Sequence, residues 1–239
     1  MCKCIFQRHI LNDDGMQLLY GKWINAEQSR RKRQHGKAKI FRKYAAECET
    51  IARLINKPPH KIRVVEFGMG WGYWCQMATA FNYDVTGLEL SKERIDHAKS
   101  LGVSVATDFS QINAATVDFV YANQVLEHVA NPRETIQQLA NLLCPGGVLL
   151  IRVPDGSGIA NSVRKSGWEP SMNAVHPLEH INTFTRDCLL ALASDLGLQE
   201  IRAPVRLSAH TPVHFWRSIK REFNDRFRLP HIYLSRVAT

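Results

Sequence analysis

Apolar residues come in short runs along the middle of the chain, and a stretch with helical spacing follows several of these runs. The runs predict buried strands at 62–66, 84–88, 103–106, 117–122 and 148–153. Helical spacing predicts helices at 73–81, at 92–100 and from Asn131-Pro132 to Leu143. Strands that alternate with helices in this rhythm form a parallel sheet with helices on both faces. We therefore expect an α/β fold with a doubly wound, mostly parallel sheet.

The segments around this region follow other patterns. Residues 17–55 are mostly helical and end before Pro58-Pro59, while 186–196 form a helix that stops at Gly197. Short apolar runs at 199–201 and 206–208 supply two further strands, so the expected sheet has seven. The chain divides into a helical N-terminal extension, a main domain with an irregular insertion, and a basic amphipathic tail: 1–57, 58–208 with the insertion at 154–182, and 209–239.

Positive charge concentrates in two places and gives a net charge of +9. The basic run 29–39 favours a solvated helix face over a site for phosphate or acidic lipid, since isolated charge runs are common. In the tail, aromatic and aliphatic residues recur every four positions between 214 and 228. This spacing favours a helix docked on the body over a helix on a membrane surface. The charge allows a nucleic-acid partner or a peripheral membrane contact without choosing between them.

Composition describes a chain that can bury a core. Hydrophobic residues make up 45% of it, no apolar run reaches the length of a membrane span, and the N-terminus lacks the apolar core of a signal peptide. Of the six cysteines, Cys75, Cys144 and Cys188 fall in expected helices or at their ends. That distribution favours reduced thiols and a cytoplasmic location.

A glycine-rich turn, Gly68-Met69-Gly70-Trp71-Gly72, follows the first expected strand of the domain and precedes a helix. Glycines at alternate positions permit a sharp turn and a close approach of the backbone to a ligand. The helix beyond the turn offers free N–H groups and the positive end of its dipole. Glu66, just before the turn, is flanked by apolar residues and needs a hydrogen bond or a cation if buried. This stretch predicts a nucleotide-like ligand.

Two more acids stand at strand ends. Glu89, which ends the strand 84–88, can accept hydrogen bonds from both hydroxyls of a ribose, with Ser91 as the N-cap of the next helix. Asp108 can accept from an exocyclic amine, or simply form a turn. A nicotinamide-dependent dehydrogenase would show a similar pattern. However, its G-x-G-x-x-G turn has a third glycine where this chain has Tyr73.

Five motifs occur in the order seen in one family: Glu66-x-Gly68-x-Gly70-x-Gly72, Glu89, Asp108, Val125-Leu126-Glu127-His128-Val129 and Pro145-Gly146-Gly147. With them, the region from Ile62 to Ile201 resembles the class I S-adenosylmethionine-dependent methyltransferases, which have a Rossmann-like sheet. The resemblance implies S-adenosylmethionine as cofactor. It implies contacts to it from Glu66, Gly68, Gly70, Gly72, Glu89, Leu90, Asp108, Phe109, Asn123 and Gln124.

Two outer segments resemble the branch that modifies sugars and other small molecules. Cys2-x-Cys4 looks like a truncated form of that branch's zinc-binding cysteine leader, and the segment His176 to Thr185 looks like its His-rich segment. Quinone-pathway O-methyltransferases hold a divalent metal on a segment that begins with Glu and ends in Glu-His. Here Gln124 replaces the first Glu, so we expect no metal.

The expected function is transfer of a methyl group to an acceptor, most simply a hydroxyl oxygen of a small molecule or saccharide. Such an acceptor needs a base, and histidine suits that role because its pKa lies near neutrality. The candidates are His128, His176 and His180. An RNA or protein methyltransferase and a cofactor-binding partner subunit without turnover are the alternatives. Neither the acceptor nor the oligomeric state can be read from the sequence.

Overall fold

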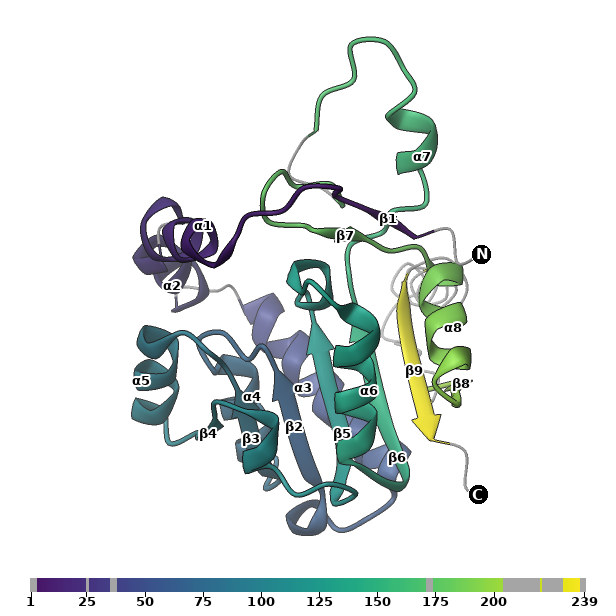
Figure 1. Ribbon diagram of the computed structural model, residues 1–239. Helices are drawn as coiled ribbons and strands as arrows, with labels where there is room; N and C mark the ends of the chain where they lie inside the picture. Colours follow the sequence, from purple (N-terminus) through teal and green to yellow (C-terminus); the bar gives the residue numbers. More distant parts are fainter. Residues whose placement is uncertain are drawn as a thin grey trace.

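The computed structural model describes residues 4–24, 26–34, 38–170, 174–203, 220 and 230–236 (Figure 1). Its centre is a seven-stranded sheet with strand order β4-β3-β2-β5-β6-β9-β8. The strands are β2 (Arg63–Phe67), β3 (Asp84–Leu88), β4 (Ser104–Ala106), β5 (Val117–Asn123), β6 (Leu143–Arg152), β8 (Leu198–Ile201) and β9 (His231–Arg236). Strands β2 to β6 pair in parallel, and β9 runs antiparallel to both of its neighbours. The expected doubly wound, mostly parallel sheet is confirmed.

Helices cover both faces of the sheet, because alternate residues of each strand supply separate cores. In β5, Val120 packs with α6 (Pro132–Leu142) and α8 (Arg186–Asp195) on one face. Its neighbours Phe119 and Tyr121 pack on the other face with α3 (Ala38–Ile55), α4 (Tyr73–Ala80) and α5 (Lys92–Ser100). A strand buried on both faces reads as a continuous apolar run, which is why the pattern of the sequence located these strands.

A cover of smaller elements lies over the carboxyl ends of the parallel strands, at the top of Figure 1. It contains α1 (Asp13–Leu18), the π-helix η1 (Leu19–Trp23), α2 (Ala26–Gln34) and the short α7 (Ile159–Ser162). Strand β1 (Ile5–Phe6) pairs there with β7 (Asn182–Thr183) in a separate two-stranded sheet. Single turns of 3-10 helix, η2 (Pro59–Lys61), η3 (Phe109–Gln111) and η4 (Leu126–His128), complete the described elements.

The C-terminal part of the sheet differs from expectation. Strand β6 begins at Leu143, because Leu143 already pairs with Val117 before the register shifts ahead of Val148. Within the expected tail, His231–Arg236 forms β9 and inserts between β6 and β8. Its apolar residues Ile232 and Leu234 are fully buried. The sequence patterns place this segment in the tail and predict no strand there. The expected strand 206–208 and the expected helix 214–228 lie outside the described residues, apart from Lys220.

Cys4 and Cys188 form a disulfide, which corrects the expectation that Cys188 is a reduced thiol. The fold brings their Cα atoms to 5.4 Å although 184 positions separate them in the chain. No spacing rule links cysteines at that distance, so the sequence alone could not reveal the pair. Cys75 and Cys144 are free thiols, as expected. Cys2 lies outside the described residues.

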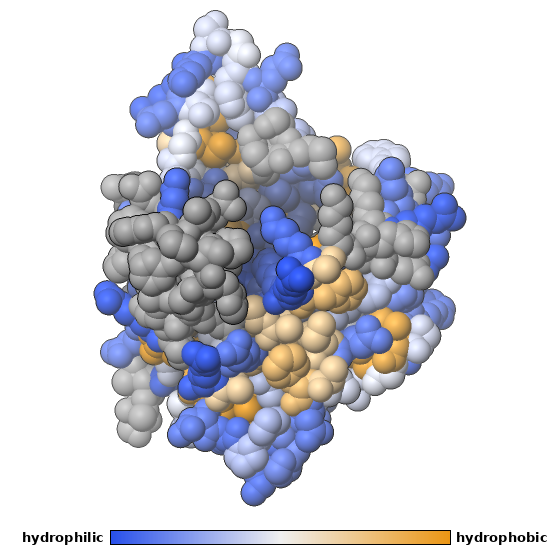
Figure 2. Space-filling model, turned by 180° about the vertical axis from the view of Figure 1, so that it is seen from behind, coloured by the Kyte–Doolittle hydropathy of each residue, from blue (hydrophilic) through white to orange (hydrophobic). Residues whose placement is uncertain are grey.

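Seen from behind in Figure 2, hydrophilic side chains surround an apolar area near the centre of that face. Among the described helices, we find none with the length and apolar character needed to cross a membrane. The expected cytoplasmic location remains a prediction.

A buried ion pair links the N-terminal extension to the centre of the sheet. Arg152, the one charged residue in the apolar run 148–153, bonds to Glu47 of α3. Tyr121 joins both: its hydroxyl accepts from Arg152 at 2.9 Å and donates to Glu47 at 3.2 Å. The Trp74 indole also donates to Glu47, at 3.0 Å. The two charges therefore satisfy one another in a site where either one alone would be costly.

Replacing Glu47 with Ala should lower the free energy of unfolding by about 3–5 kcal/mol, because Arg152 would then be buried without its counter-ion. The matched control is Glu49→Ala on the same helix, which removes an ion pair to Arg53 whose side chains are about half exposed. That change should cost less than about 1 kcal/mol. Urea-induced unfolding of the two variants checks this, and equal losses would contradict a special role for the buried pair.

Candidate functional site

The glycine turn follows β2, at the point where the strand order of the sheet reverses. Strands β3 and β4 lie to one side of β2, and β5 and β6 lie to the other. In open α/β sheets, ligands bind in the crevice beyond the carboxyl ends of the strands at this point. The structure places the turn after β2 on one side of the crevice and Asn123 and Gln124, which end β5, on the other.

The three glycines of the turn differ in what surrounds them. Gly68 has φ +67°, and a Cβ there would lie 2.6 Å from the side chain of Val125. At Gly72 (φ +77°) a Cβ would lie 2.8 Å from that of Ala98, so this glycine lets α4 and α5 pack closely. Around Gly70 no atom lies within 4 Å of the position of a Cβ. Gly68 and Gly72 therefore serve packing, whereas Gly70 faces open space.

Glu89 holds the turn in place. Its Oε2 accepts a hydrogen bond from the backbone N–H of Gly70 at 3.0 Å, and its Oε1 accepts from Leu90 and Ser91 at 2.9 and 3.0 Å. Arg94 lies 3.8 Å away as a counter-ion. The carboxylate is only 8% exposed, so it is fixed in orientation. The side chain of Ser91 makes no capping bond, contrary to expectation.

A cavity of about 180 Å³ runs along the turn to the end of β5. Five of the expected cofactor residues line it: Glu66, Gly68, Gly70, Asn123 and Gln124. Sequence reasoning missed further lining residues, namely Ser29, Tyr44, Met69, Trp71, Tyr73, Trp74, Arg94 and Tyr121. Ser29 belongs to the basic run, and its hydroxyl accepts from the Trp71 indole at 3.4 Å. Helix α2 thus adjoins the cavity through one polar residue of the basic run, for which a solvated helix face was the favoured expectation.

Two of the residues that line the cavity, Glu66 and Gln124, have unusual environments. Glu66 is 6% exposed and accepts a hydrogen bond from the Cys75 thiol at 3.0 Å, which supplies the partner that a buried acid needs. Burial and the neighbouring Glu66 raise the pKa of Cys75 well above its usual value, so the thiol stays protonated. Gln124 has φ +55°, a conformation that is uncommon for residues other than glycine and clusters at functional sites.

Asp108 and Phe109 lie beyond β4 and outside the lining of the cavity. Asp108 is exposed and caps η3, because its Oδ1 accepts from the Ser110 N–H at 2.8 Å. The hydrogen bond from Ser110 lowers the pKa of Asp108. Phe109 stacks on Phe67 with ring centroids 5.6 Å apart. Both the turn-forming and the ligand-binding interpretation of Asp108 remain consistent with this position.

The structure brings the three candidate histidines together over the end of β5. The ring centroids of His128 and His180 are 5.0 Å apart, and those of His176 and His180 are 5.5 Å apart. His128 Nδ1 donates to the backbone carbonyl of Glu179 at 2.8 Å, so Nε2 carries the lone pair of the neutral ring. Burial lowers the pKa of His128, which keeps that ring neutral. His176 pairs with the Glu179 carboxylate at 3.1 Å.

Glu127 completes this histidine cluster. It is 1% exposed, and neither carboxyl oxygen has a hydrogen-bond partner among the described residues. Its Oε1 lies 3.9 Å from His128 Nε2. Burial raises the pKa of Glu127 to about 7. Nitrogen or oxygen atoms of Glu127, His128 and His180 lie within 4.8 Å of one another, so these side chains have the donor set to hold a divalent ion. The expected absence of a metal remains a prediction.

Comparisons with known proteins point to one family. The family described as "Methyltransferase domain" matches residues 37–203. The ubiquinone biosynthesis O-methyltransferase of Maricaulis maris is 25% identical over 172 residues, which are 67% of this chain and 68% of that protein. The tRNA 5-carboxymethoxyuridine methyltransferase of Escherichia coli is 33% identical over 146 residues, 56% of each chain. For several such relatives, this chain therefore spans little more than half of their length.

Solved structures show the same fold. The plantazolicin methyltransferase BpumL, in complex with SAH, superposes with a TM-score of 0.60 at 16% sequence identity. The superposition covers 93% of both chains. At this identity the likeness concerns the arrangement of helices and strands alone, and it agrees with the expected Rossmann-like sheet.

The raised pKa of Glu127 predicts a pH-dependent stability. An unfolded chain would release this proton near 4.5, whereas the folded chain holds it up to about 7. Between these values the folded state binds more protons, so its stability falls as the pH rises and levels off above 7. Glu127→Gln removes the ionisable group. The free energy of unfolding of this variant, relative to that of the parent, should therefore increase by about 3 kcal/mol from pH 4 to pH 8.

Chemical unfolding at both pH values measures this difference. Glu169→Gln, at an exposed position, is the control and should show no comparable change. A Glu127→Gln variant whose relative stability does not vary with pH would show that the carboxyl group is solvated or paired in the folded protein.

Proposed function

Because the chain belongs to the methyltransferase family that matches residues 37–203, we propose that it transfers a methyl group from S-adenosylmethionine to a hydroxyl oxygen of a small molecule or saccharide. Membership confirms the family predicted from the glycine turn and the strand ends, and with it the cofactor. The observation that carries the proposal on the acceptor is the cluster of His128, His176 and His180. His128 follows β5 in the chain, and the residues at the end of β5, Asn123 and Gln124, line the cavity.

The residues around the cavity suit the cofactor. Gly70 leaves open space at the turn, and Glu89 presents a fixed carboxylate that can accept from ribose hydroxyls. We assign the methionine part to Gly68, Gly70 and Gly72, the adenine end to Leu90, Asp108 and Phe109, and the methyl-donor side to Glu66, Asn123 and Gln124. When bound, the cofactor supplies an electrophilic methyl group on its sulfonium. Alignment and exclusion of water are then what the protein has to provide.

The histidine cluster provides a base for the acceptor. A hydroxyl that receives a methyl group must lose its proton, and a neutral imidazole can take it. His180 is our first candidate, because it lies between the rings of His128 and His176. The carboxyl group of Glu127, 3.9 Å from His128 Nε2, would stabilise an imidazolium once ionised. Ubiquinone-pathway relatives are O-methyltransferases by name, which is consistent with an oxygen acceptor.

An RNA acceptor is the second candidate. The net charge of +9 and the similarity to a tRNA methyltransferase favour it. The described lining of the cavity does not, because it holds the acid Glu66 and the single cation Arg94 rather than a group of positive charges. A partner subunit that binds cofactor without turnover is the remaining alternative.

Glu89→Ala should weaken the binding of S-adenosylmethionine by about tenfold to a hundredfold, the effect of losing hydrogen bonds to a charged group. The variant loses both the ribose acceptor and the bond that fixes Gly70. Isothermal titration calorimetry measures the change, with Glu93→Ala, exposed on α5 just after Glu89, as the control. Unchanged affinity would remove Glu89 from the cofactor site.

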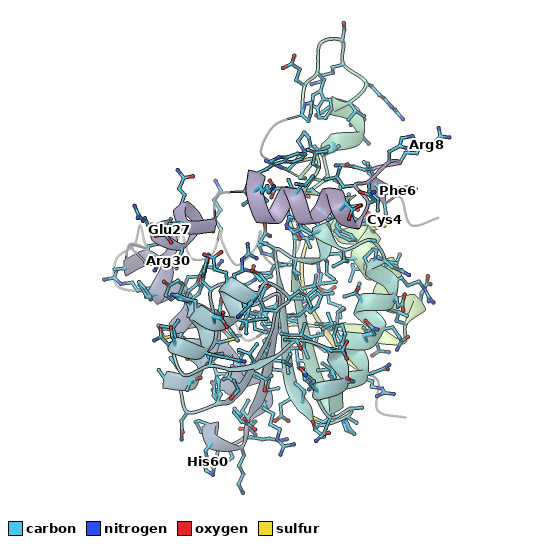
Figure 3. The ribbon with its side chains drawn as sticks, turned by 60° about the vertical axis from the view of Figure 1, so that its left-hand side comes forward. Cys4, Phe6, Arg8, Glu27, Arg30 and His60 are labelled. Atoms are coloured by element: carbon cyan, nitrogen blue, oxygen red, sulfur yellow. A yellow bond between two sulfur atoms is a disulfide. The ribbon has the colours of Figure 1, made fainter. Side chains whose placement is uncertain are left out.

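His180→Ala should lower kcat by about 10²–10⁴-fold while leaving the affinity for S-adenosylmethionine unchanged, as expected for loss of a general base. The assay follows formation of S-adenosylhomocysteine with a panel of hydroxylated small molecules and saccharides, and with total tRNA. His60→Ala is the control, since His60 lies at the opposite end of the molecule (Figure 3). Turnover on tRNA alone, with a steep dependence on salt, would favour the RNA alternative. Cofactor binding without turnover would favour the partner subunit.

A further inference from the structure

The N-terminal strap, which we define as residues 4–7, runs along the segment that carries His180. Ile5 and Phe6 pair with Thr183 and Asn182 in the β1–β7 sheet. Gln7 extends this contact: its backbone N–H donates to the carbonyl of Ile181 at 2.8 Å, and its side-chain amide donates to the carbonyl of His180 at 3.0 Å. The strap thus contacts the backbone of the proposed base directly.

The other side of the same segment is fixed to the body of the protein. The Asn182 side chain donates to the carbonyl of Val129 at 2.7 Å, next to η4 and His128. The Thr183 hydroxyl donates to the carbonyl of Ala174 at 2.9 Å. His180 therefore approaches His128 from a segment, just before β7, that is held from both sides, with the strap as the outer support.

The strap has little of its own to hold it in place. A strand of two residues is marginally stable by itself, and Phe6 is 69% exposed, so it contributes little burial. Its anchor is the disulfide from Cys4 to Cys188, in the first turn of α8. Cys188 is fully buried, and the Thr185 hydroxyl accepts its backbone N–H at 3.2 Å. Cys188 is thus held rigidly in α8, and the disulfide tethers Cys4 and the strap to it. Figure 3 shows Cys4, Phe6 and Arg8 together at this outer edge.

We propose that the strap positions His180 for methyl transfer and that the Cys4–Cys188 disulfide makes this positioning sensitive to thiol reductants. The inference rests on the proposed role of His180. In the reaction, a thiolate of a dithiol reductant attacks the Cys4 sulfur and breaks the S–S bond, releasing the Cys188 thiolate. The second thiol of the reductant then displaces Cys4. Two electrons pass to the protein, two protons complete its thiols, and the reductant becomes the disulfide.

The test compares the oxidised protein, the protein reduced with dithiothreitol, and Cys4→Ser. This variant removes the disulfide at the strap and leaves the buried Cys188 in place. Amide hydrogen exchange is measured first, because it needs no acceptor. Reduction should speed exchange at Gln7 by at least tenfold, and Cys4→Ser should match the reduced protein and no longer respond to reductant. Cys144→Ser is the control: Cys144 is a free thiol, so this variant keeps the disulfide and should behave as the parent.

Turnover is measured second, on the acceptor identified for the parent protein. Reduced protein, Cys4→Ser and Gln7→Ala should each lose kcat by about tenfold or more, with the affinity for S-adenosylmethionine unchanged. Equal exchange in the oxidised and reduced states would overturn the tether. Faster exchange with full kcat would overturn the positioning role. If no acceptor is found, the proposed function fails separately, and the exchange data still decide whether the disulfide holds the strap.

Discussion

Parallel pairing of β2, β3, β4, β5 and β6 is the constraint on which the rest of the molecule depends. Strands that run the same way bring all their carboxyl ends to one edge, so the residues that follow each strand meet there. The glycine turn after β2, Glu89 after β3 and Gln124 at the end of β5 become neighbours for this reason alone. The buried pair of Arg152 and Glu47 fixes α3 to the same sheet.

The two halves of the site are built differently. At the glycine turn, Glu89 accepts three hydrogen bonds from the backbone N–H groups of Gly70, Leu90 and Ser91. The histidine cluster consists of side chains from separate loops, and contacts between residues far apart in the chain, such as His128 to Glu179, hold them. The glycine turn is rigid because its hydrogen bonds hold the backbone itself. The histidine cluster is only as rigid as the loops that carry it, which is why a strap anchored by one disulfide can affect it.

Sequence patterns succeeded where the physical cause is local. Buried strands appear in the sequence as apolar runs, and the turn after β2 is marked by its glycines. The helix that begins after Thr185 is capped by the Thr185 side chain, as expected. They failed where the outcome depends on the rest of the fold. The side chain of Ser91 makes no capping bond, and the tail strand β9 is defined by its pairing with β6 and β8.

The sequence by itself determined the buried parallel strands, the family and the glycine turn after β2, because apolar runs and glycines are local features of the chain. Only the tertiary structure decided the strand order, the place of β9 in the sheet, that His180 meets His128 beside the buried Glu127, and that Cys4 bonds to Cys188. The His180–His128 and Cys4–Cys188 contacts join residues that are separated by about fifty and by 184 positions. Their formation depends on how loops pack above the sheet, and no periodicity in the chain records that packing.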